Sequence, residues 1–252
     1  MKNTYEINIV WLYPDLMSTY GDRGNVMILE NRLFWRGIKA KVIKVSLGTP
    51  DAELKRADLI FIGGAQDYAQ EIVNRDLLKR KKILAELIES GIPGLFICGA
   101  YQFLGKHYIT AEQNIIKGLG IFDLFTANPG LDSPRLIGKV SAKLVIPGLS
   151  DEIVTGFENH GGRTFLSSHV KPLAEIIFGF GNNGKDFSEG AIYKNAIGTY
   201  LHGPVLANNP KLADFLLTKA IEKKYSQEIT LKPLNDKLED LANKNFLNRL
   251  SN

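Results

Sequence analysis

The chain has 252 residues, 44% of them hydrophobic and 23% charged, which is ordinary for a globular protein with one large α/β domain, alone or with a small appendage. Its net charge of +4 is too small, and its lysines and arginines too dispersed, to indicate a nucleic-acid partner. No run reaches the roughly 18 apolar residues of a membrane span, and the first residues lack the apolar centre of a signal peptide. A single cysteine excludes an internal disulfide, so we expect a cytoplasmic protein.

The first part of the chain alternates between apolar runs, which predict strands, and amphipathic segments, which predict helices. The predicted strands cover residues 7–13, 41–45, 59–62 and 94–97, and the predicted helices cover 26–36 and 76–90. The runs at 59–62 and 94–97 are continuously apolar, which is typical of strands buried on both faces. This alternation predicts a parallel sheet covered by helices.

The second part of the chain has short apolar segments separated by Gly and Asn turns, which predict antiparallel hairpins that extend the sheet. These segments cover residues 136–145, 153–158, 175–180, 190–193 and 196–200. A helix is predicted at 208–225. We therefore expect one domain over residues 1–225, followed at 226–252 by a surface helix or a partly ordered tail.

Two glycine-rich stretches imitate nucleotide-binding motifs. Gly179–Gly184 matches the pattern G-x-G-x-x-G, but it lies between two strand-like segments instead of opening a helix, which predicts a hairpin loop. In the stretch from Gly99 to Lys106 the two glycines are one residue too far apart for a phosphate loop, and His107 replaces the Ser or Thr that would bind magnesium. We expect no ATP site, no metal site and no cofactor in this chain.

Cys98 follows the buried strand predicted at 94–97 and precedes two small residues, with a helix predicted to begin near Tyr101. A strand that turns sharply into a helix presents such a residue as an exposed nucleophile. The helix N-terminus lowers the pKa of a thiol at that position, and the backbone N–H after the nucleophile can stabilise an oxyanion. A lone cysteine is otherwise most often a small buried apolar residue.

A thiolate nucleophile requires a base, and the chain has four histidines. His202 ends the apolar segment 197–201 and is therefore predicted to lie at the end of a strand, like Cys98. His160 lies in a polar turn, and His107 and His169 have the surroundings of surface or loop residues. We predict that His202 is the base.

Six motifs are spread along the chain, namely Tyr20–Asn25, Gly63–Gly64, Cys98–Gln102, Phe157–Thr164, Gly179–Asn183 and Tyr200–Gly203. Together they resemble class I glutamine amidotransferases of the cobyric-acid-synthase-like branch. Within that branch they are similar to the glutaminase subunits of lipid II isoglutaminyl synthases. The resemblance extends from about Ile9 to Tyr225. It implies a three-layer α/β sandwich with a mostly parallel central sheet extended by antiparallel hairpins.

The resemblance also implies roles for individual residues. Cys98 would attack the side-chain amide of glutamine to give a thioester, and His202 would act as general acid and base. Backbone groups at Gly64, Ala65 and Gly99 would form the oxyanion hole. Arg135 would pair with the α-carboxylate of glutamine through its planar guanidinium. Gln102 would contact the substrate or hold the turn at Cys98.

One position departs from the family pattern. Many class I amidotransferases place a glutamate two residues after the histidine to orient it, whereas this chain has Pro204 there. Three alternatives remain at this stage: a Cys–His dyad, an internal acid such as Glu158, or a carboxylate from a partner chain. Without an orienting acid such a site is expected to be a weak glutaminase.

The resemblance implies a partner as well. The chain would form a heterodimer with a MurT-like ligase, which would bind ATP and Mg²⁺ and amidate the α-carboxyl of D-glutamate in the membrane-bound lipid II. Two alternatives are an amidotransferase subunit for another acceptor, such as a cobyrinic-acid-type carboxylate, and a catalytically silent docking subunit.

Overall fold

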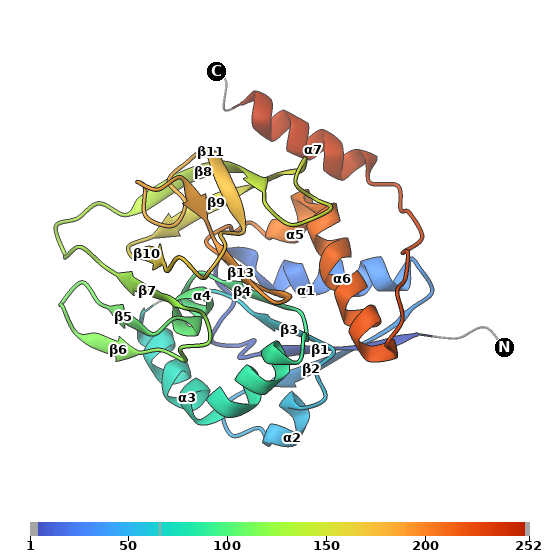
Figure 1. Cartoon of the computed structure of the whole chain (residues 1–252), viewed down its shortest axis with the longest axis horizontal. Coiled ribbons are helices and arrows are strands. Elements are labelled where there is room, and N and C mark those ends of the chain that lie inside the picture. The colour runs from blue at the N-terminus through green and yellow to red at the C-terminus, as the bar shows by residue number, and fades with distance from the viewer. Residues whose placement is uncertain (1–4, 66, 250–252) are drawn as a thin grey trace.

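The computed structural model describes residues 5–65 and 67–249, and its centre is a six-stranded sheet (Figure 1). The strand order is β13-β14-β4-β3-β1-β2, and every neighbouring pair is parallel except β13 and β14. The strands are β1 (Glu6–Leu12), β2 (Lys39–Val45), β3 (Leu59–Ile62), β4 (Gly94–Ile97), β13 (Ala191–Tyr193) and β14 (Ala196–Thr199). The predicted α/β class with a mostly parallel central sheet is confirmed.

Helices cover both faces of this sheet. The helices of the described residues are η1 (Thr19–Gly21), α1 (Arg23–Phe34), α2 (Asp51–Leu54), α3 (Asp67–Glu89), α4 (Gly99–Leu104), α5 (Val205–Asn208), α6 (Pro210–Tyr225) and α7 (Lys237–Asn248). Successive strand residues point to opposite faces, so Phe61 packs in the apolar cluster under α1 and α6, while Ile60 packs in the cluster under α3. The continuous apolar run of β3 is thus explained by burial on both faces.

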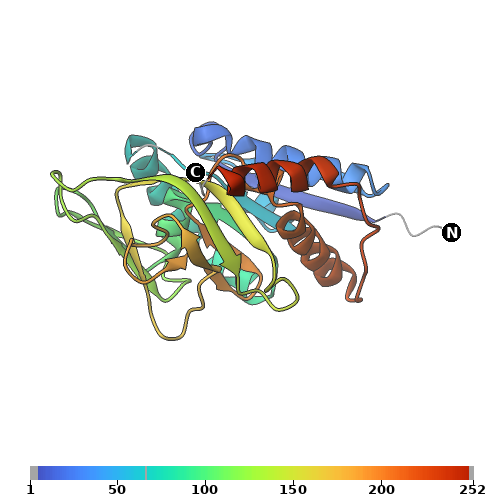
Figure 2. The same ribbon diagram turned by 90° about the horizontal axis from the view of Figure 1, so that it is seen from above.

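The remaining strands form two smaller sheets with the orders β10-β7-β5-β6 and β12-β11-β8-β9. They are β5 (His107–Ile109), β6 (Ile115–Lys117), β7 (Leu124–Ala127), β8 (Leu136–Leu144), β9 (Ile153–His160), β10 (Arg163–Leu166), β11 (Ala174–Phe178) and β12 (Ser188–Glu189). Figures 1 and 2 both place them at the side of the molecule opposite the N-terminal end of β1, which is the side where the parallel strands end.

The prediction that all the hairpins extend the central sheet is therefore wrong in part, because only β13 is added antiparallel to its edge. Strand β14 pairs parallel with β4, and β8 pairs with β9 on one side and with β11 on the other. The physical reason lies in the side chains of β8. Val140, Ala142 and Leu144 point into the apolar core, so this sheet packs face-on against the domain and does not join the central sheet edge to edge.

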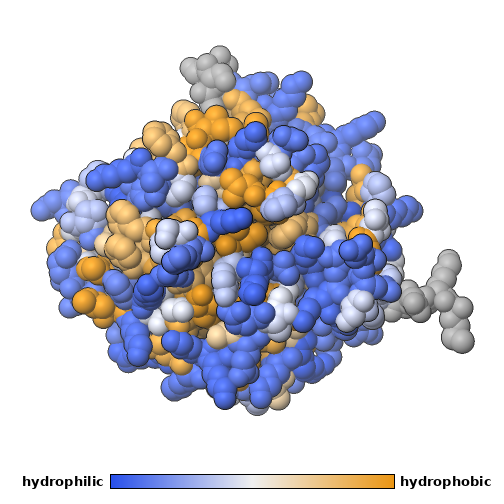
Figure 3. All heavy atoms as spheres, viewed as in Figure 1, coloured by the Kyte–Doolittle hydropathy of each residue, from blue (hydrophilic) through white to orange (hydrophobic). Residues whose placement is uncertain are grey.

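The outer faces of the small sheets stay in solvent. Figure 3 shows a mainly hydrophilic surface on which apolar side chains are interspersed. Large exposed apolar side chains on β8, β11 and the loop that follows β11 include Ile137, Ile177, Phe178 and Phe180. The small sheets thus have one face packed on the core and one face open, as antiparallel sheets commonly do.

Several boundaries differ from the predicted ones. Helix α3 begins at Asp67, well before the predicted start at residue 76. In the segment 226–252, for which we expected a helix or a tail, the structure has α7, which packs on α5 and β9, whereas 250–252 lie outside the described residues. The Gly179–Gly184 stretch joins the antiparallel strands β11 and β12, which confirms the predicted hairpin loop. Within 5–65 and 67–249, no helix combines the length and apolar character needed to cross a membrane.

Candidate active site

Cys98 lies between β4 and α4, in the sharp turn that was predicted for it. Its φ of 52° and ψ of −107° place a non-glycine residue in a strained backbone conformation, which costs on the order of 1–3 kcal/mol. The turn is held by the neighbouring strand, because the Cys98 N–H donates to the Thr199 carbonyl at 2.8 Å. The surrounding structure therefore fixes the thiol at the end of the parallel sheet, at the first turn of a helix.

His202 follows β14 and is almost completely buried, with 1% of its surface exposed. Its backbone exchanges two hydrogen bonds with Phe157 of β9, which tie the end of the central sheet to the second small sheet. The imidazole Nδ1 lies 3.1 Å from Asp22 Oδ1. Nε2 is buried and has no hydrogen-bond partner within the described part of the chain, which leaves it available to the nearby Cys98 thiol.

Asp22 is the acid that orients His202. It is fully buried in the turn between β1 and α1. While Oδ1 faces His202, Oδ2 accepts the backbone N–H of Gly64 at 2.7 Å. Because Asp22 can only accept a hydrogen bond when ionised, it places the proton of neutral His202 on Nδ1 and leaves Nε2 free to take a proton. Cys98, His202 and Asp22 therefore have the arrangement of a nucleophile, a base and an orienting acid.

The protonation state of His202 follows from these contacts. Burial opposes the charged imidazolium, but the contacts with Asp22 and Cys98 outweigh burial and raise the pKa of His202 to about 10. A proton that moves from the Cys98 thiol to His202 is thus stabilised on the imidazole. This is the ion pair that an activated cysteine needs.

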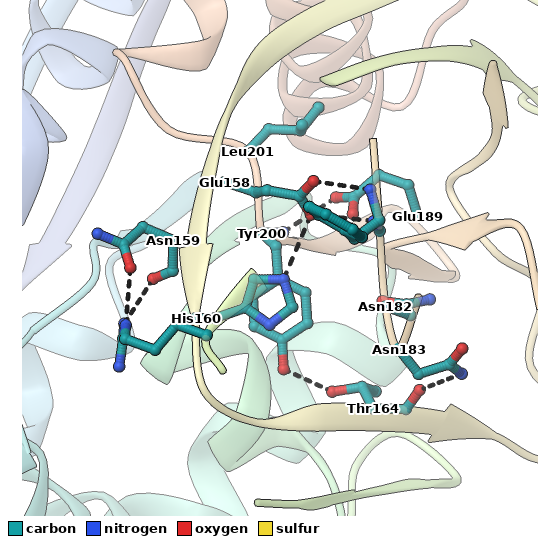
Figure 4. Close-up of polar contacts among 12 residues, drawn as sticks. Glu158, Asn159, His160, Thr164, Asn182, Asn183, Glu189, Tyr200 and Leu201 are labelled. Carbon is teal, nitrogen blue, oxygen red and sulfur yellow. Dashed lines mark hydrogen bonds and ion pairs between the residues drawn. The ribbon is translucent and has the colours of Figure 1, made fainter. Parts of the chain in front are cut away.

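Glu158, the internal acid considered from the sequence, does not contact His202. Its carboxylate accepts the backbone N–H groups of Phe180 and Gly181 at 2.7 and 2.9 Å, and it lies 3.4 Å from His160 Nε2 (Figure 4). In β9 it points to the same side as His160, whose ring stacks on Tyr200 with 3.6 Å between the ring centroids. The expectation that Glu158 orients the base is wrong, because its oxygens bind the loop after β11.

The predicted oxyanion hole is only partly supported. The N–H of Gly64 donates to Asp22, so this group does not point into the pocket and the prediction for Gly64 is wrong. Ala65 lines the pocket beside Cys98. Gly99 is the first residue of α4, where a backbone N–H has no acceptor within the helix. A Cβ on Gly99 would lie 2.8 Å from the Gln70 side chain, which explains the glycine.

A polar pocket opens beside the thiol, and it contains both predicted substrate-binding residues. Its lining residues are Thr19, Tyr20, Ala65, Gln70, Cys98, Gln102, Tyr108, Asn128, Arg135, Asn159, His160, Gly161 and Gly162. The side chain of Gln102 is buried and donates to the Tyr200 hydroxyl at 3.1 Å. Arg135 is exposed and donates from Nε and Nη2 to the side-chain and backbone oxygens of Asn159, each at 2.8 Å.

Three residues of the site were not identified from the sequence, namely Asp22, Tyr20 and Asn159. All three lie inside motifs that carry the family resemblance, but no local pattern separates an orienting acid from a turn aspartate. Asp22 could have been identified only from the predicted topology. It follows the first parallel strand and so lies at the same sheet edge as Cys98 and His202. Within the described residues, no cluster of three or more His, Cys, Asp or Glu side chains could hold a metal ion.

Comparisons with known proteins agree with this geometry. The CobB/CobQ-like glutamine amidotransferase domain matches residues 8–210. The GatD subunit of lipid II isoglutaminyl synthase (glutamine-hydrolyzing) from Staphylococcus aureus (strain N315) is 42% identical over 87% of this chain and 86% of that protein. The GatD subunit from Streptococcus pneumoniae (strain ATCC BAA-255 / R6) is 41% identical over 92% of this chain and 87% of that protein.

A solved structure shows the same fold at low sequence identity. A chain of PurLQS from Thermotoga maritima superposes with a TM-score of 0.54 and 16% identity, over 89% of this chain and 100% of that chain. This likeness extends over most of the domain and concerns the fold alone.

Proposed function

The chain belongs to the CobB/CobQ-like glutamine amidotransferase family, and from this premise we propose that it is the glutamine-hydrolysing subunit of a lipid II isoglutaminyl synthase. Glutamine hydrolysis is supported by the contact of His202 with Asp22 on one side and with the strained Cys98 on the other. The acceptor follows from the two GatD relatives, whose similarity covers about nine tenths of the chain.

In the first half of the reaction the proton of the Cys98 thiol already lies on His202, whose pKa of about 10 keeps the imidazole protonated, and the Cys98 thiolate attacks the side-chain amide carbon of glutamine. The resulting oxyanion accepts hydrogen bonds from the backbone N–H groups of Gly99 and Ala65. The C–N bond then breaks as the His202 imidazolium gives its proton to the amide nitrogen. Ammonia leaves, and a γ-glutamyl thioester remains on Cys98.

The second half restores the enzyme. Neutral His202 takes a proton from a water molecule, whose oxygen attacks the thioester carbon. When the C–S bond breaks, Cys98 leaves as the thiolate and glutamate is released, while the proton taken from water stays on His202. Asp22 contacts His202 Nδ1 and stabilises the imidazolium during the cycle.

Arg135 is suited to bind the α-carboxylate of glutamine. A guanidinium has five N–H donors, and Asn159 takes two of them. The remaining donors are available to a carboxylate in the pocket, and the two bonds to Asn159 orient them. Gln102 forms part of the pocket wall and braces Tyr200 behind it.

The ammonia is delivered to a separate ATP-dependent ligase, which is MurT-like and forms a heterodimer with this chain in the cytoplasm. That ligase carries ATP and Mg²⁺ and activates the α-carboxyl of D-glutamate in lipid II, so the present chain needs no cofactor of its own. Two features support this division of labour. The relatives are named as subunits of a synthase, and both glycine-rich stretches of the sequence deviate from nucleotide-binding motifs.

The test is ammonia release from glutamine, measured with the chain alone and with the ligase, followed by amidation of lipid II in the presence of ATP. Wild type is expected to release ammonia and Cys98→Ala is expected to release none. Release that persists in Cys98→Ala would overturn the glutaminase assignment. Glutamine hydrolysis without amidation of lipid II, but with amidation of another carboxylate, would overturn the acceptor.

A further inference from the structure

The side chain of Asn159 links Arg135, the cation of the pocket, to Tyr20, whose ring packs on His202. Asn159 accepts hydrogen bonds from Arg135, and its own Nδ2 donates to the hydroxyl of Tyr20 at 2.7 Å. The ring of Tyr20 lies edge-on to the imidazole of His202, with 4.9 Å between the centroids. Arg135, Asn159 and Tyr20 all line the pocket that contains Cys98.

Asn159 reaches both neighbours because of its place in β9. Side chains alternate along a strand, so Glu158 and His160 point to one side and Asn159 to the other, as Figure 4 shows. Glu158 and His160 are buried and held by the loop after β11 and by Tyr200. The contacts of Glu158 and His160 therefore fix this part of β9, and Asn159 lines the pocket.

Tyr20 has little else to hold it in place. Its backbone has a φ of 52° and a ψ of 26°, in the left-handed region that a tyrosine seldom adopts, and 52% of its surface is exposed. It lies two residues before Asp22, so one short turn contacts His202 at Nδ1 through Asp22 and on the ring through Tyr20. The position of the ring therefore depends on its hydroxyl bond to Asn159 and on its packing against His202 and Phe157.

We propose that Asn159 is a positioning residue that couples binding of the α-carboxylate of glutamine at Arg135 to closure of Tyr20 over His202. This inference rests on the proposed glutaminase function. Arg135 is exposed and is held on one side by its two bonds to Asn159, and a bound carboxylate restrains its guanidinium from a second side. A fixed Arg135 orders Asn159, and ordered Asn159 holds Tyr20 against the imidazole. The covered imidazolium then gives its proton to the departing amide nitrogen and not to bulk water.

The coupling predicts that the enzyme selects glutamine over other primary amides. An amide without an α-carboxylate cannot bind Arg135 in this way and so does not bring Tyr20 over His202. The discriminating probe is 4-aminobutanamide, which is glutamine without that carboxylate. For wild type, hydrolysis of glutamine should exceed hydrolysis of the probe by a large factor. In Asn159→Ala, kcat/KM for glutamine should fall about 10- to 100-fold, as expected for loss of hydrogen bonds to a charged group, while the probe reaction changes less than about threefold.

A second variant separates the bond between Asn159 and Tyr20 from the bonds between Arg135 and Asn159. Tyr20→Phe keeps the ring and the bonds between Arg135 and Asn159 but removes the hydroxyl that Asn159 holds. The KM for glutamine should stay near that of wild type and kcat should fall. Asn128→Ala is the matched control, because Asn128 lines the same pocket but its Oδ1 accepts the N–H of Gly130. It should change the glutamine and probe reactions in parallel.

The assays use the full chain with its ligase partner, and thermal unfolding verifies that each variant is folded. Equal losses on glutamine and on the probe in Asn159→Ala would overturn the coupling, since they indicate a purely structural role. An unchanged glutamine reaction in Asn159→Ala would overturn it as well. These outcomes differ from failure of the proposed function, in which wild type itself releases no ammonia from glutamine.

Discussion

Asp22 and His202 are 180 residues apart in the sequence, yet the carboxylate of Asp22 lies 3.1 Å from the imidazole Nδ1 in a fully buried contact. The second carboxylate oxygen is held by the Gly64 N–H, so the acid is fixed from two sides. The turn between β1 and α1 therefore supplies the orienting acid that Pro204 cannot supply. Within this chain, Asp22 is the carboxylate that contacts the base.

The first prediction concerns the tautomer of His202. In Asp22→Asn the amide oxygen can still accept the Gly64 N–H, which places the amide NH₂ against Nδ1. Nδ1 must then accept, the proton moves to Nε2, and neutral His202 can no longer take the thiol proton. Ammonia release should fall by up to roughly 10⁴-fold, the size of the loss when a triad acid is neutralised. The control is Asp58→Asn, in a buried aspartate bonded to Asn8 and Lys224, which should retain activity.

The second prediction is the protonation of His202 itself. Burial works against the charge, and Asp22 and Cys98 raise the pKa of His202 to about 10 from an ordinary 6.5. The stabilisation from this raised pKa is fully present below about pH 6.5 and is lost as the pH rises through about 10. An NMR titration should therefore find the ring protonated at neutral pH in wild type. The midpoint should move down in Asp22→Asn and stay unchanged in Asp58→Asn; equal midpoints in all three proteins would contradict the assignment.

Much of the fold could be predicted from the sequence because buried parallel strands have continuous apolar runs. The strands β3 and β4 have the predicted bounds for this reason. By contrast, β5 and β6 are three residues each, too short for any period to be detected. The early part of α3 also makes a tertiary contact, since the side chain of Asn74 donates to the carbonyl of Lys117. Such contacts leave no trace in the apolar pattern.

In the active site, too, some residues could be located from the local sequence pattern and others only from tertiary contacts. Cys98 and His202 could be located from their neighbours in the sequence, because each follows an apolar strand. The roles of Asp22 and Glu158 could not be separated in this way, since both are acids in polar turns or at strand ends. Only the pairing of β9 with β8, together with the loop after β11, shows that the carboxylate of Glu158 faces away from the base.

The third prediction tests the role of Glu158. It is fully buried and accepts two backbone N–H groups from the loop after β11, where Gly179 approaches it with a φ of 112°. In Glu158→Gln an NH₂ group replaces one acceptor and faces a backbone N–H, which should cost about 1–3 kcal/mol of the free energy of unfolding. Chemical denaturation measures this loss.

Activity separates a structural role of Glu158 from a catalytic one. Folded Glu158→Gln should retain most of its kcat for glutamine hydrolysis and a His202 pKa near that of wild type. A kcat as low as that of Asp22→Asn, together with a lowered His202 pKa, would instead identify Glu158 as an orienting acid.

The last prediction concerns a second buried acid, Glu189, which lies beside Tyr200 (Figure 4). Its Oε1 accepts the hydroxyl of Thr199 and the N–H of Tyr200, whereas Oε2 has no partner among the described residues. Burial raises the pKa of Glu189 to about 7, and the hydrogen bonds only partly offset this effect. Because the folded chain holds this proton more tightly than the unfolded chain, stability should decrease as the pH rises from about 4.5 through about 7.

Glu189→Gln keeps the accepting oxygen and removes the ionisation. The variant should therefore lack this decrease, which is on the order of 3 kcal/mol for a shift of this size. Its free energy of unfolding should approach or exceed that of wild type above pH 7. Urea denaturation of both proteins between pH 5 and pH 8 measures the difference in slope. Parallel curves would mean that Glu189 ionises at the same pH in the folded and unfolded chains, and that the unpaired Oε2 is solvated despite its burial.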